Sequence, residues 1–190
     1  MKIKAVFLDR DGVINQYPGD FKYVTSPEEF HLLPGAGQAI NKLNAAGFKV
    51  FVVSNQAGVG KGIYSQGTLD AITCGMEELL KKDGAVIDQV YYCTHTNEAN
   101  CNCRKPKNGL VHMAVARMAN YGKQLDLSKS YFVGDTIRDI ETGKSSGVKT
   151  ILVFSGKEKQ DNKPNWHIQP DFTALDLPKA VEIILKEGAK

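Results

Sequence analysis

Five short apolar runs recur along the chain and predict buried β-strands. They lie at residues 3–8, 49–53, 89–92, 130–133 and 149–154. Between and after these runs, apolar residues at helical spacing predict four amphipathic helices, at residues 36–43, 69–80, 110–118 and 177–185. Three of the four helical patterns are followed by a glycine, at positions 47, 122 and 188. This alternation predicts an α/β fold, a three-layer, Rossmann-like parallel sheet with helices on both faces.

Polar residues follow three of the predicted strands, and their placement suggests a ligand site. Asp9, Ser54 and Asp135 each come just after an apolar run. In an open parallel sheet, ligands bind outside the carboxyl ends of the strands, so these three side chains are expected to meet at one edge. The alternative is that they are ordinary polar loop residues of a solvated domain.

Asp9 and Asp11 form the most informative pair, because only Arg10 separates them before the chain turns at Gly12. Two carboxylates so close repel each other unless a cation lies between them. Mg²⁺ is bound in this way, usually by one or two protein carboxylates together with substrate oxygens. The pair therefore predicts a Mg²⁺ site, and the alternative is an acidic turn without a function.

Length and composition fit one globular domain over residues 1–190. The net charge is +3 and 24% of the residues are charged, a balance that argues against a dedicated nucleic-acid binder. No apolar run approaches the roughly 20 residues of a membrane span, and the N-terminus lacks the apolar core of about 7–15 residues of a secretory signal. We therefore expect a cytoplasmic protein. Residues 156–165 are expected to form a mobile surface loop and are a candidate lid.

Cysteines supply a second signal. Cys93, His95, Cys101 and Cys103 lie within eleven residues. Four such ligands in one short loop predict a closed, structural Zn²⁺ site, whereas disulfides are the alternative and are rare inside cells. The fourth cysteine, Cys74, lies opposite the apolar side of its helix and is expected to be a free thiol.

Arg104 and Lys105 directly follow the predicted zinc ligands, which would hold them rigidly. If this loop leans over the strand ends, Lys105 places a positive charge beside Asp9 and Asp11. Carboxylates, a metal and fixed positive donors are the components that phosphoryl transfer requires. The alternative is a solvated pair of surface charges.

Together these residues resemble the haloacid dehalogenase superfamily of phosphatases. The resemblance rests on four motifs: Asp9-x-Asp11-Gly12, Ser54, Lys105 and Gly134-Asp135-x-x-x-Asp139. It spans the chain from Ile3 to about Phe154, and no large insertion interrupts it, which implies a minimal cap. The Cys-x-His and Cys-x-Cys-Arg-Lys-Pro segments resemble a narrower branch, that of the heptose 1,7-bisphosphate and histidinol-phosphate phosphatases.

The resemblance implies roles for the motif residues. Asp9 is expected to be a nucleophile that forms an aspartyl-phosphate, and Asp11 a general acid and then base. Mg²⁺ is expected on Asp9, Asp135 and the backbone carbonyl of Asp11. Ser54 and Lys105 are expected to bind the phosphoryl group.

Further positions carry expectations about the substrate. Asn55, Gln56 and Arg104 lie where related enzymes contact it, and Lys61 suits a second phosphate. Asp139 is expected to orient Lys105 or a metal-bound water. Residues 11–15, 23–24 and 58–62 resemble the heptose enzymes. The resemblance therefore favours removal of the 7-phosphate of D-glycero-D-manno-heptose 1,7-bisphosphate, and we expect a monomeric enzyme.

Three other interpretations remain open at this stage. The first is a histidinol-phosphate phosphatase, which would share its motifs with the favoured heptose bisphosphate phosphatase. The second is a nucleic-acid-binding module built on the zinc loop. The third is an inactive scaffold, against which the intact motif residues argue.

Overall fold

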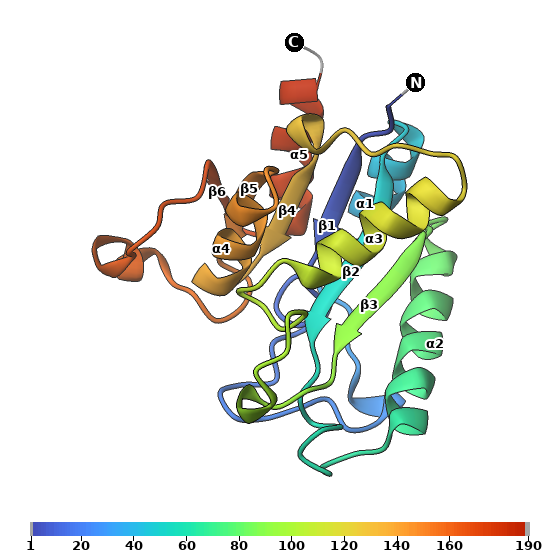
Figure 1. Ribbon diagram of the computed structural model, residues 1–190, viewed down its shortest axis with the longest axis vertical. Helices are drawn as coiled ribbons and strands as arrows, with labels where there is room; N and C mark the ends of the chain where they lie inside the picture. Colours follow the sequence, from blue (N-terminus) through green and yellow to red (C-terminus); the bar gives the residue numbers. More distant parts are fainter. Residues whose placement is uncertain (1, 189–190) are drawn as a thin grey trace.

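A six-stranded, fully parallel sheet organises the protein, whose computed structural model describes residues 2–188 (Figure 1). The strand order is β3-β2-β1-β4-β5-β6. The strands are β1 (Ala5–Leu8), β2 (Lys49–Asn55), β3 (Gln89–Cys93), β4 (Tyr131–Gly134), β5 (Lys149–Val153) and β6 (Phe172–Ala174). This is the strand order of a doubly wound nucleotide-binding sheet, so the expected fold class is confirmed.

Within residues 2–188, five helices cover the two faces of the sheet. They are α1 (Ala36–Ala45), α2 (Gln66–Lys82), α3 (Gly109–Asn120), α4 (Ile137–Ser145) and α5 (Leu177–Gly188), and short 3-10 turns lie at Pro27–Glu29, Asn97–Ala99, Leu127–Lys129 and Gln160–Asn165. Successive strand residues point to opposite faces. In β1, Val6 and Leu8 pack with α1, α2 and α5, whereas Ala5 and Phe7 pack with α3.

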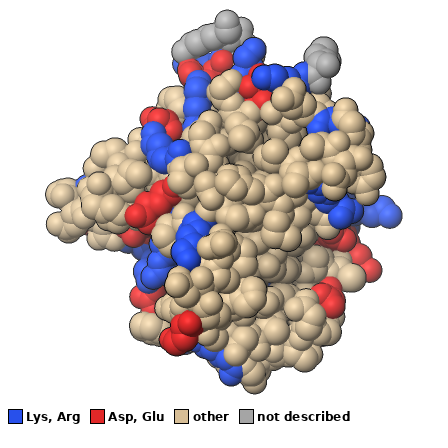
Figure 2. All heavy atoms as spheres, viewed as in Figure 1, with Lys and Arg blue, Asp and Glu red and all other residues tan. Residues whose placement is uncertain are grey.

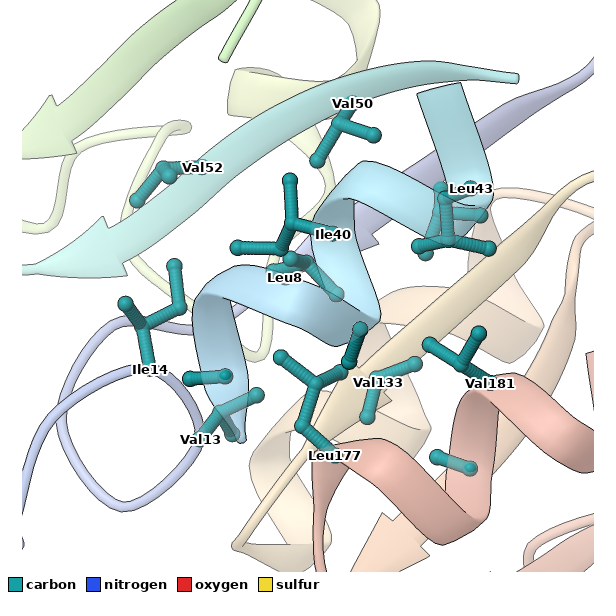
Figure 3. Packing of buried hydrophobic residues seen from close by; sticks show 14 of the residues in the cluster. Leu8, Val13, Ile14, Ile40, Leu43, Val50, Val52, Val133, Leu177 and Val181 are labelled. Atoms are coloured by element: carbon teal, nitrogen blue, oxygen red, sulfur yellow. The ribbon is translucent and has the colours of Figure 1, made fainter. Parts of the chain in front are cut away.

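The larger of the two apolar cores lies between the sheet and α1, α2 and α5. Ile40 and Leu43 of α1 contribute to it with Val133 of β4 (Figure 3). All three side chains are fully buried. Because both faces of the sheet are covered, its central strands read as continuous apolar runs in the sequence.

Some sequence expectations need correction. β6 was not predicted, and Ser54 lies within β2, one residue before its end, rather than after it. Each of the five expected strands differs from the observed strand by one to two residues at one or both ends. α4 is not among the four helices that the apolar pattern predicts. Residues 156–165 are not loop throughout, because Gln160–Asn165 form a 3-10 turn. The four expected helices are confirmed.

The chain runs outward from β1 to β2 and β3 and then returns to the other side of β1 with β4. Ligands bind at such a reversal of strand order, outside the carboxyl ends. The connections after β1, β2 and β3 gather at this edge in Figure 1. The strand order thus directs attention to the residues that follow β1 and β4.

Acidic and basic side chains are interspersed on the face shown in Figure 2. This agrees with the small net charge of the sequence. Within residues 2–188, no helix is long and apolar enough to cross a membrane.

Candidate active site

The turn after β1 sets the position of Asp9 and Asp11. Asp9 N–H donates to the carbonyl of Val133 in β4 (3.0 Å), and the amides of residues 13–15 all converge on the Arg10 carbonyl. Gly12 has φ +82°, and a Cβ there would lie 2.3 Å from Asp135 Oδ2. A glycine is therefore required both by the backbone conformation and by the close approach of Asp135.

Lys105 lies between two carboxylates. Its Nζ is 2.8 Å from Asp9 Oδ2 and 2.6 Å from Asp139 Oδ1. Only 4% of Lys105 is exposed, so these ion pairs are shielded from solvent. Asp139 also caps α4, because Thr136 N and Oγ1 donate to its Oδ2 (3.0 and 2.7 Å). The expected contact of Asp139 with Lys105 is thus present.

Asp135 follows β4 directly and is 2% exposed. Its Oδ2 accepts a hydrogen bond from Lys157 N (2.8 Å). A Cβ at Gly156 would lie 2.0 Å from the same oxygen, so the segment after β5 approaches Asp135 through a glycine backbone. Carboxylate oxygens of Asp9, Asp135 and Asp139 all lie within 4.8 Å of one another.

This crowding alters the protonation of the cluster. Burial raises the pKa of Asp9 to about 6, although Lys105 opposes the shift. Burial, together with Asp9 and Asp139, also raises the pKa of Asp135 well above its ordinary value. Burial lowers the pKa of Lys105, but Asp139 and Asp9 outweigh it and the net shift is upward. Three carboxylates thus share one ammonium, which leaves negative charge for a further cation to neutralise.

The Asp9 and Asp135 carboxylates therefore fit a hard divalent cation. Both are buried at the carboxyl ends of neighbouring strands, and oxygen is the ligand that Mg²⁺ prefers. Asp139 is completely buried, pairs with Lys105 and caps α4 through Thr136, so it has a structural task in the same cluster.

Asp11 lies in a separate network. Its Oδ1 accepts from Arg10 Nε and Nη2 (3.1 and 3.0 Å) and from Asn15 Nδ2 (2.9 Å). Its Oδ2 accepts from Arg10 Nη2 (3.1 Å) and Gln56 Nε2 (2.9 Å). Gln56 also donates to Ser54 Oγ (3.2 Å) and accepts from the Tyr64 hydroxyl (2.9 Å). Asp11 is therefore held by the protein, and Lys105 contacts Asp9 instead.

Two of the positions expected to contact substrate make protein contacts here. Gln56 is 1% exposed and engaged as described above. The Asn55 amide binds the backbone of Lys105, donating to its carbonyl (3.1 Å) and accepting from its N–H (3.0 Å). Contact of either side chain with substrate stays a prediction.

Cys93, His95, Cys101 and Cys103 come together as the sequence predicts. Five of the distances between their sulfur and Nδ1 atoms are 3.3–3.6 Å. A tetrahedral Zn²⁺ with bonds of about 2.3 Å to sulfur has edges of about 3.7 Å, so the spacing fits zinc. A disulfide needs about 2.05 Å, and the four cysteines of the chain are free. Cys74 is exposed, as expected.

A hollow of about 230 Å³ beside Lys105 is lined by Arg104 and Arg138. Arg104 donates from Nε to Asn97 Oδ1 (2.6 Å) and from Nη1 to the His95 carbonyl (3.3 Å). The Arg138 guanidinium makes no hydrogen bond or ion pair within residues 2–188, although the backbone carbonyl of Arg138 accepts from Thr142 Oγ1 (2.8 Å). Lys61 is exposed and its Nζ lies 5.8 Å from the centre of the Tyr23 ring. Positive charge is therefore available around the site.

Sequence reasoning missed Arg10 and Arg138. Arg10 was read only as a spacer between two carboxylates, yet it is completely buried. An arginine in a segment otherwise predicted to be buried could have been noticed, because a buried charge needs a partner. Arg138 precedes Asp139 on α4, and nothing in its sequence context distinguishes it from a surface arginine.

Comparisons with known proteins agree with this geometry. The family described as HAD-hydrolase-like matches residues 102–180. A D-glycero-D-manno-heptose-1,7-bisphosphate 7-phosphatase of Chlorobaculum tepidum is 37% identical over 185 residues, which cover 94% of this chain and 92% of the relative. The chain belongs to the haloacid dehalogenase superfamily of phosphatases. The enzyme class expected from the motifs is thereby confirmed.

Other phosphatases of this superfamily are similar along their full length. A D-glycero-beta-D-manno-heptose-1,7-bisphosphate 7-phosphatase of Neisseria meningitidis serogroup A is 35% identical over 189 residues, covering 98% of this chain and 97% of the relative. The crystal structure of the D,D-heptose 1,7-bisphosphate phosphatase of B. bronchiseptica, complexed with magnesium and phosphate, has a TM-score of 0.87 and 32% identity. It is matched over 97% of this chain and 99% of that one. The expected branch of the superfamily is confirmed.

Proposed function

We propose that this phosphatase removes the 7-phosphate of D-glycero-D-manno-heptose 1,7-bisphosphate, with Mg²⁺ as its cofactor, through an aspartyl-phosphate on Asp9. One observation supports this chemistry most directly. Lys105 pairs with Asp9 at the carboxyl end of β1, and Asp135 lies beside this pair. Asp11 follows Asp9 by two positions in the sequence. The substrate is supported by the relatives, which are named for this activity.

Two displacements account for the reaction. In the first, a carboxylate oxygen of Asp9 attacks phosphorus, and the bond to the sugar oxygen breaks as Asp11 gives that oxygen a proton. In the second, water attacks the phosphorus of the aspartyl-phosphate while Asp11 takes its proton. The bond to Asp9 then breaks and inorganic phosphate leaves. Ser54 and Lys105 donate hydrogen bonds to the transferring oxygens, where each such preorganised donor contributes about 3–4 kcal/mol.

Asp9, Asp135 and the backbone carbonyl of Asp11 would hold the Mg²⁺. Within residues 2–188 no backbone hydrogen bond ends on that carbonyl, so it is free for this purpose. When bound, Mg²⁺ neutralises charge on the phosphoryl oxygens. The ion also completes the charge balance of the acidic cluster, which Lys105 alone leaves negative.

A structural Zn²⁺ on Cys93, His95, Cys101 and Cys103 would order the loop that carries Arg104 and Lys105. Four protein ligands leave no coordination position open for water, which is typical of structural sites. The contact of Arg104 with the His95 carbonyl links the side chain to one of these ligands. In this proposal zinc therefore only positions the loop that carries Arg104 and Lys105, and takes no part in the chemical steps.

The remaining expectations are part of the same proposal. Residues 1–190 act as a single phosphatase domain and as a monomer. The free thiols of the zinc ligands suit a reducing compartment such as the cytoplasm. Family membership argues against the nucleic-acid-binding module and against the inactive scaffold.

Phosphate release tests the proposal. The zinc-loaded chain is incubated with Mg²⁺ and, in separate reactions, the heptose bisphosphate, its monophosphate product and histidinol phosphate. We expect the highest kcat/KM for the bisphosphate, and no turnover in Asp9→Asn. Equal hydrolysis of histidinol phosphate would overturn the substrate assignment. Salt-dependent binding of DNA without phosphate release would instead favour a nucleic-acid-binding module.

A further inference from the structure

Arg10 is a completely buried cation that directs two of its three guanidinium nitrogens, Nε and Nη2, at one carboxylate, that of Asp11, whereas Nη1 makes no hydrogen bond to it. Nε and Nη2 together make three hydrogen bonds of 3.0–3.1 Å to the two oxygens of Asp11. The guanidinium lies 5.7 Å from the centre of the Tyr92 ring and 6.0 Å from that of Phe30. These contacts fix the guanidinium in one orientation.

Gln56 approaches the same carboxylate from the end of β2. Its amide orientation is set by the Tyr64 hydroxyl, which donates to Oε1 and so leaves Nε2 to donate to Asp11 Oδ2. Tyr64 itself packs tightly on Gly58, where a Cβ would lie 2.1 Å from its ring. Asp11 is thus bound from two sides by Arg10 and Gln56, and the orientation of each of these side chains is fixed by its own neighbours.

We propose that Arg10, assisted by Gln56, is a positioning residue that fixes the Asp11 carboxylate for proton transfer. The inference rests on the proposed function, because it assigns Asp11 the acid and base role. Two N–H groups of one rigid guanidinium define both the position and the plane of a carboxylate. Neither Arg10 nor Gln56 contacts the phosphoryl group in this scheme.

Stability alone is a poor explanation for this arrangement. Burying a guanidinium is costly, and a buried ion pair is often no more stable than apolar side chains of the same volume. A second explanation is charge balance, in which Arg10 merely offsets the negative charge of the site. A lysine would serve that purpose too, whereas it cannot reproduce the two-pronged geometry.

The position of Asp11 matters most when the leaving group needs a proton. A sugar alkoxide is a poor leaving group and depends on Asp11, whereas p-nitrophenolate leaves without protonation. General acid–base catalysis contributes about 10²–10⁴-fold, so in the first displacement a misplaced Asp11 loses part of that factor with the sugar phosphate only. The second displacement is the same for both substrates and does not enter kcat/KM. The ratio of kcat/KM between the two substrates reports this loss. Unfolded protein lowers both values equally and leaves the ratio unchanged.

The experiment compares Arg10→Met and Arg10→Lys with the wild type on the sugar bisphosphate and on p-nitrophenyl phosphate. We expect both variants to lower kcat/KM on the sugar phosphate by about 100-fold and on the aryl phosphate by less than about 5-fold. The kcat on the aryl phosphate should fall further, because Asp11 also takes the proton of water in the second displacement. Tyr64→Phe, which removes only the hydroxyl that orients Gln56, should change the ratio in the same direction by a smaller factor. Arg117→Met is the control, because Arg117 also lies over an aromatic ring (Tyr121, 5.7 Å) but belongs to α3 outside the site.

Two outcomes would overturn the inference. An unchanged ratio in Arg10→Met would mean that Arg10 does not act through Asp11. A normal ratio in Arg10→Lys, with an altered one in Arg10→Met, would mean that only charge balance matters. Failure of the proposed function itself would appear differently, as a wild-type protein that hydrolyses neither substrate.

Discussion

Asn55 holds the backbone of Lys105 by two hydrogen bonds, one from its amide nitrogen to the Lys105 carbonyl and one from the Lys105 N–H to its amide oxygen. Asn55 ends β2, and Lys105 follows the zinc loop fifty positions later. The pair therefore links the sheet to the loop that supplies the only cation in contact with Asp9 within residues 2–188. A residue beside the phosphoryl site thus has a structural task in addition to its expected contact with substrate.

Asn55→Leu should displace Lys105 and lower kcat by about 10–100-fold, because a shift of about 1 Å can cost that much in catalysis. The loss of two hydrogen bonds should also lower the free energy of unfolding by about 1–3 kcal/mol. Steady-state kinetics and denaturant unfolding measure the two effects.

Asn44→Leu is the matched control, since Asn44 binds the backbone of Val86 by the same two hydrogen bonds (3.1 and 2.9 Å) at a distance from the site. It should lose stability and keep its kcat. A large rise in KM with unchanged kcat in Asn55→Leu would show that substrate binding is the main task of Asn55.

The sequence predicted the parts of the site that depend on strand ends. Asp9 and Asp135 follow apolar runs, and parallel strands bring their carboxyl ends together. The contacts of Arg10 and Asn55 could not be predicted, because each depends on which segments meet across the fold. β6 was missed for another reason: Phe172–Ala174 is too short for a periodic pattern.

The acidic cluster predicts how Mg²⁺ affects stability at different pH. Burial raises the pKa of Asp9 from 3.8 to about 6, and that of Asp135 also rises. A group whose pKa is higher in the folded than in the unfolded state stabilises the fold at low pH, and this contribution is lost as the pH rises through the folded value. The metal-free protein should therefore lose stability from these two groups between about pH 4 and above pH 6.

Mg²⁺ binds the ionised carboxylates, so it should raise Tm more at about pH 8 than at about pH 5. Thermal unfolding with and without Mg²⁺ at each pH measures the difference, and Asp135→Asn should abolish most of it. An equal effect of Mg²⁺ at both pH values would contradict the assignment of the metal to Asp9 and Asp135.

Zinc analysis tests the cysteine cluster. The purified chain should contain about one Zn²⁺ after Mg²⁺ is removed, and Cys101→Ser should lose it. Loss of zinc should disorder the loop and displace Arg104 and Lys105, so kcat/KM should fall although no group that contacts phosphorus has changed. Cys74→Ser is the control, because Cys74 is a free, exposed thiol away from the cluster. A Cys93–Cys101 disulfide without metal would reverse the interpretation.

Specificity depends on the positive charge around the phosphoryl site. The second phosphate of a bisphosphate can accept charge-assisted hydrogen bonds from Lys61 or Arg104, and each contributes about 1.5–3 kcal/mol. A monophosphate lacking that group should therefore lose about one to two decades of kcat/KM. Kinetics with both substrates give the ratio directly.

Lys61→Ala and Arg104→Ala should lower kcat/KM more for the bisphosphate than for the monophosphate, and so narrow this ratio. Arg138→Ala tests the other arginine of the hollow beside Lys105. Arg104 also binds Asn97 and the His95 carbonyl, so its variant can disturb the zinc loop. That disturbance lowers kcat/KM equally for both substrates and leaves their ratio unchanged. Lys163→Ala is the control for Lys61, since Lys163 lies over the Phe154 ring (5.3 Å) on another part of the surface. If all three variants affect both substrates equally, the second phosphate is bound elsewhere and the preference for a bisphosphate needs another explanation.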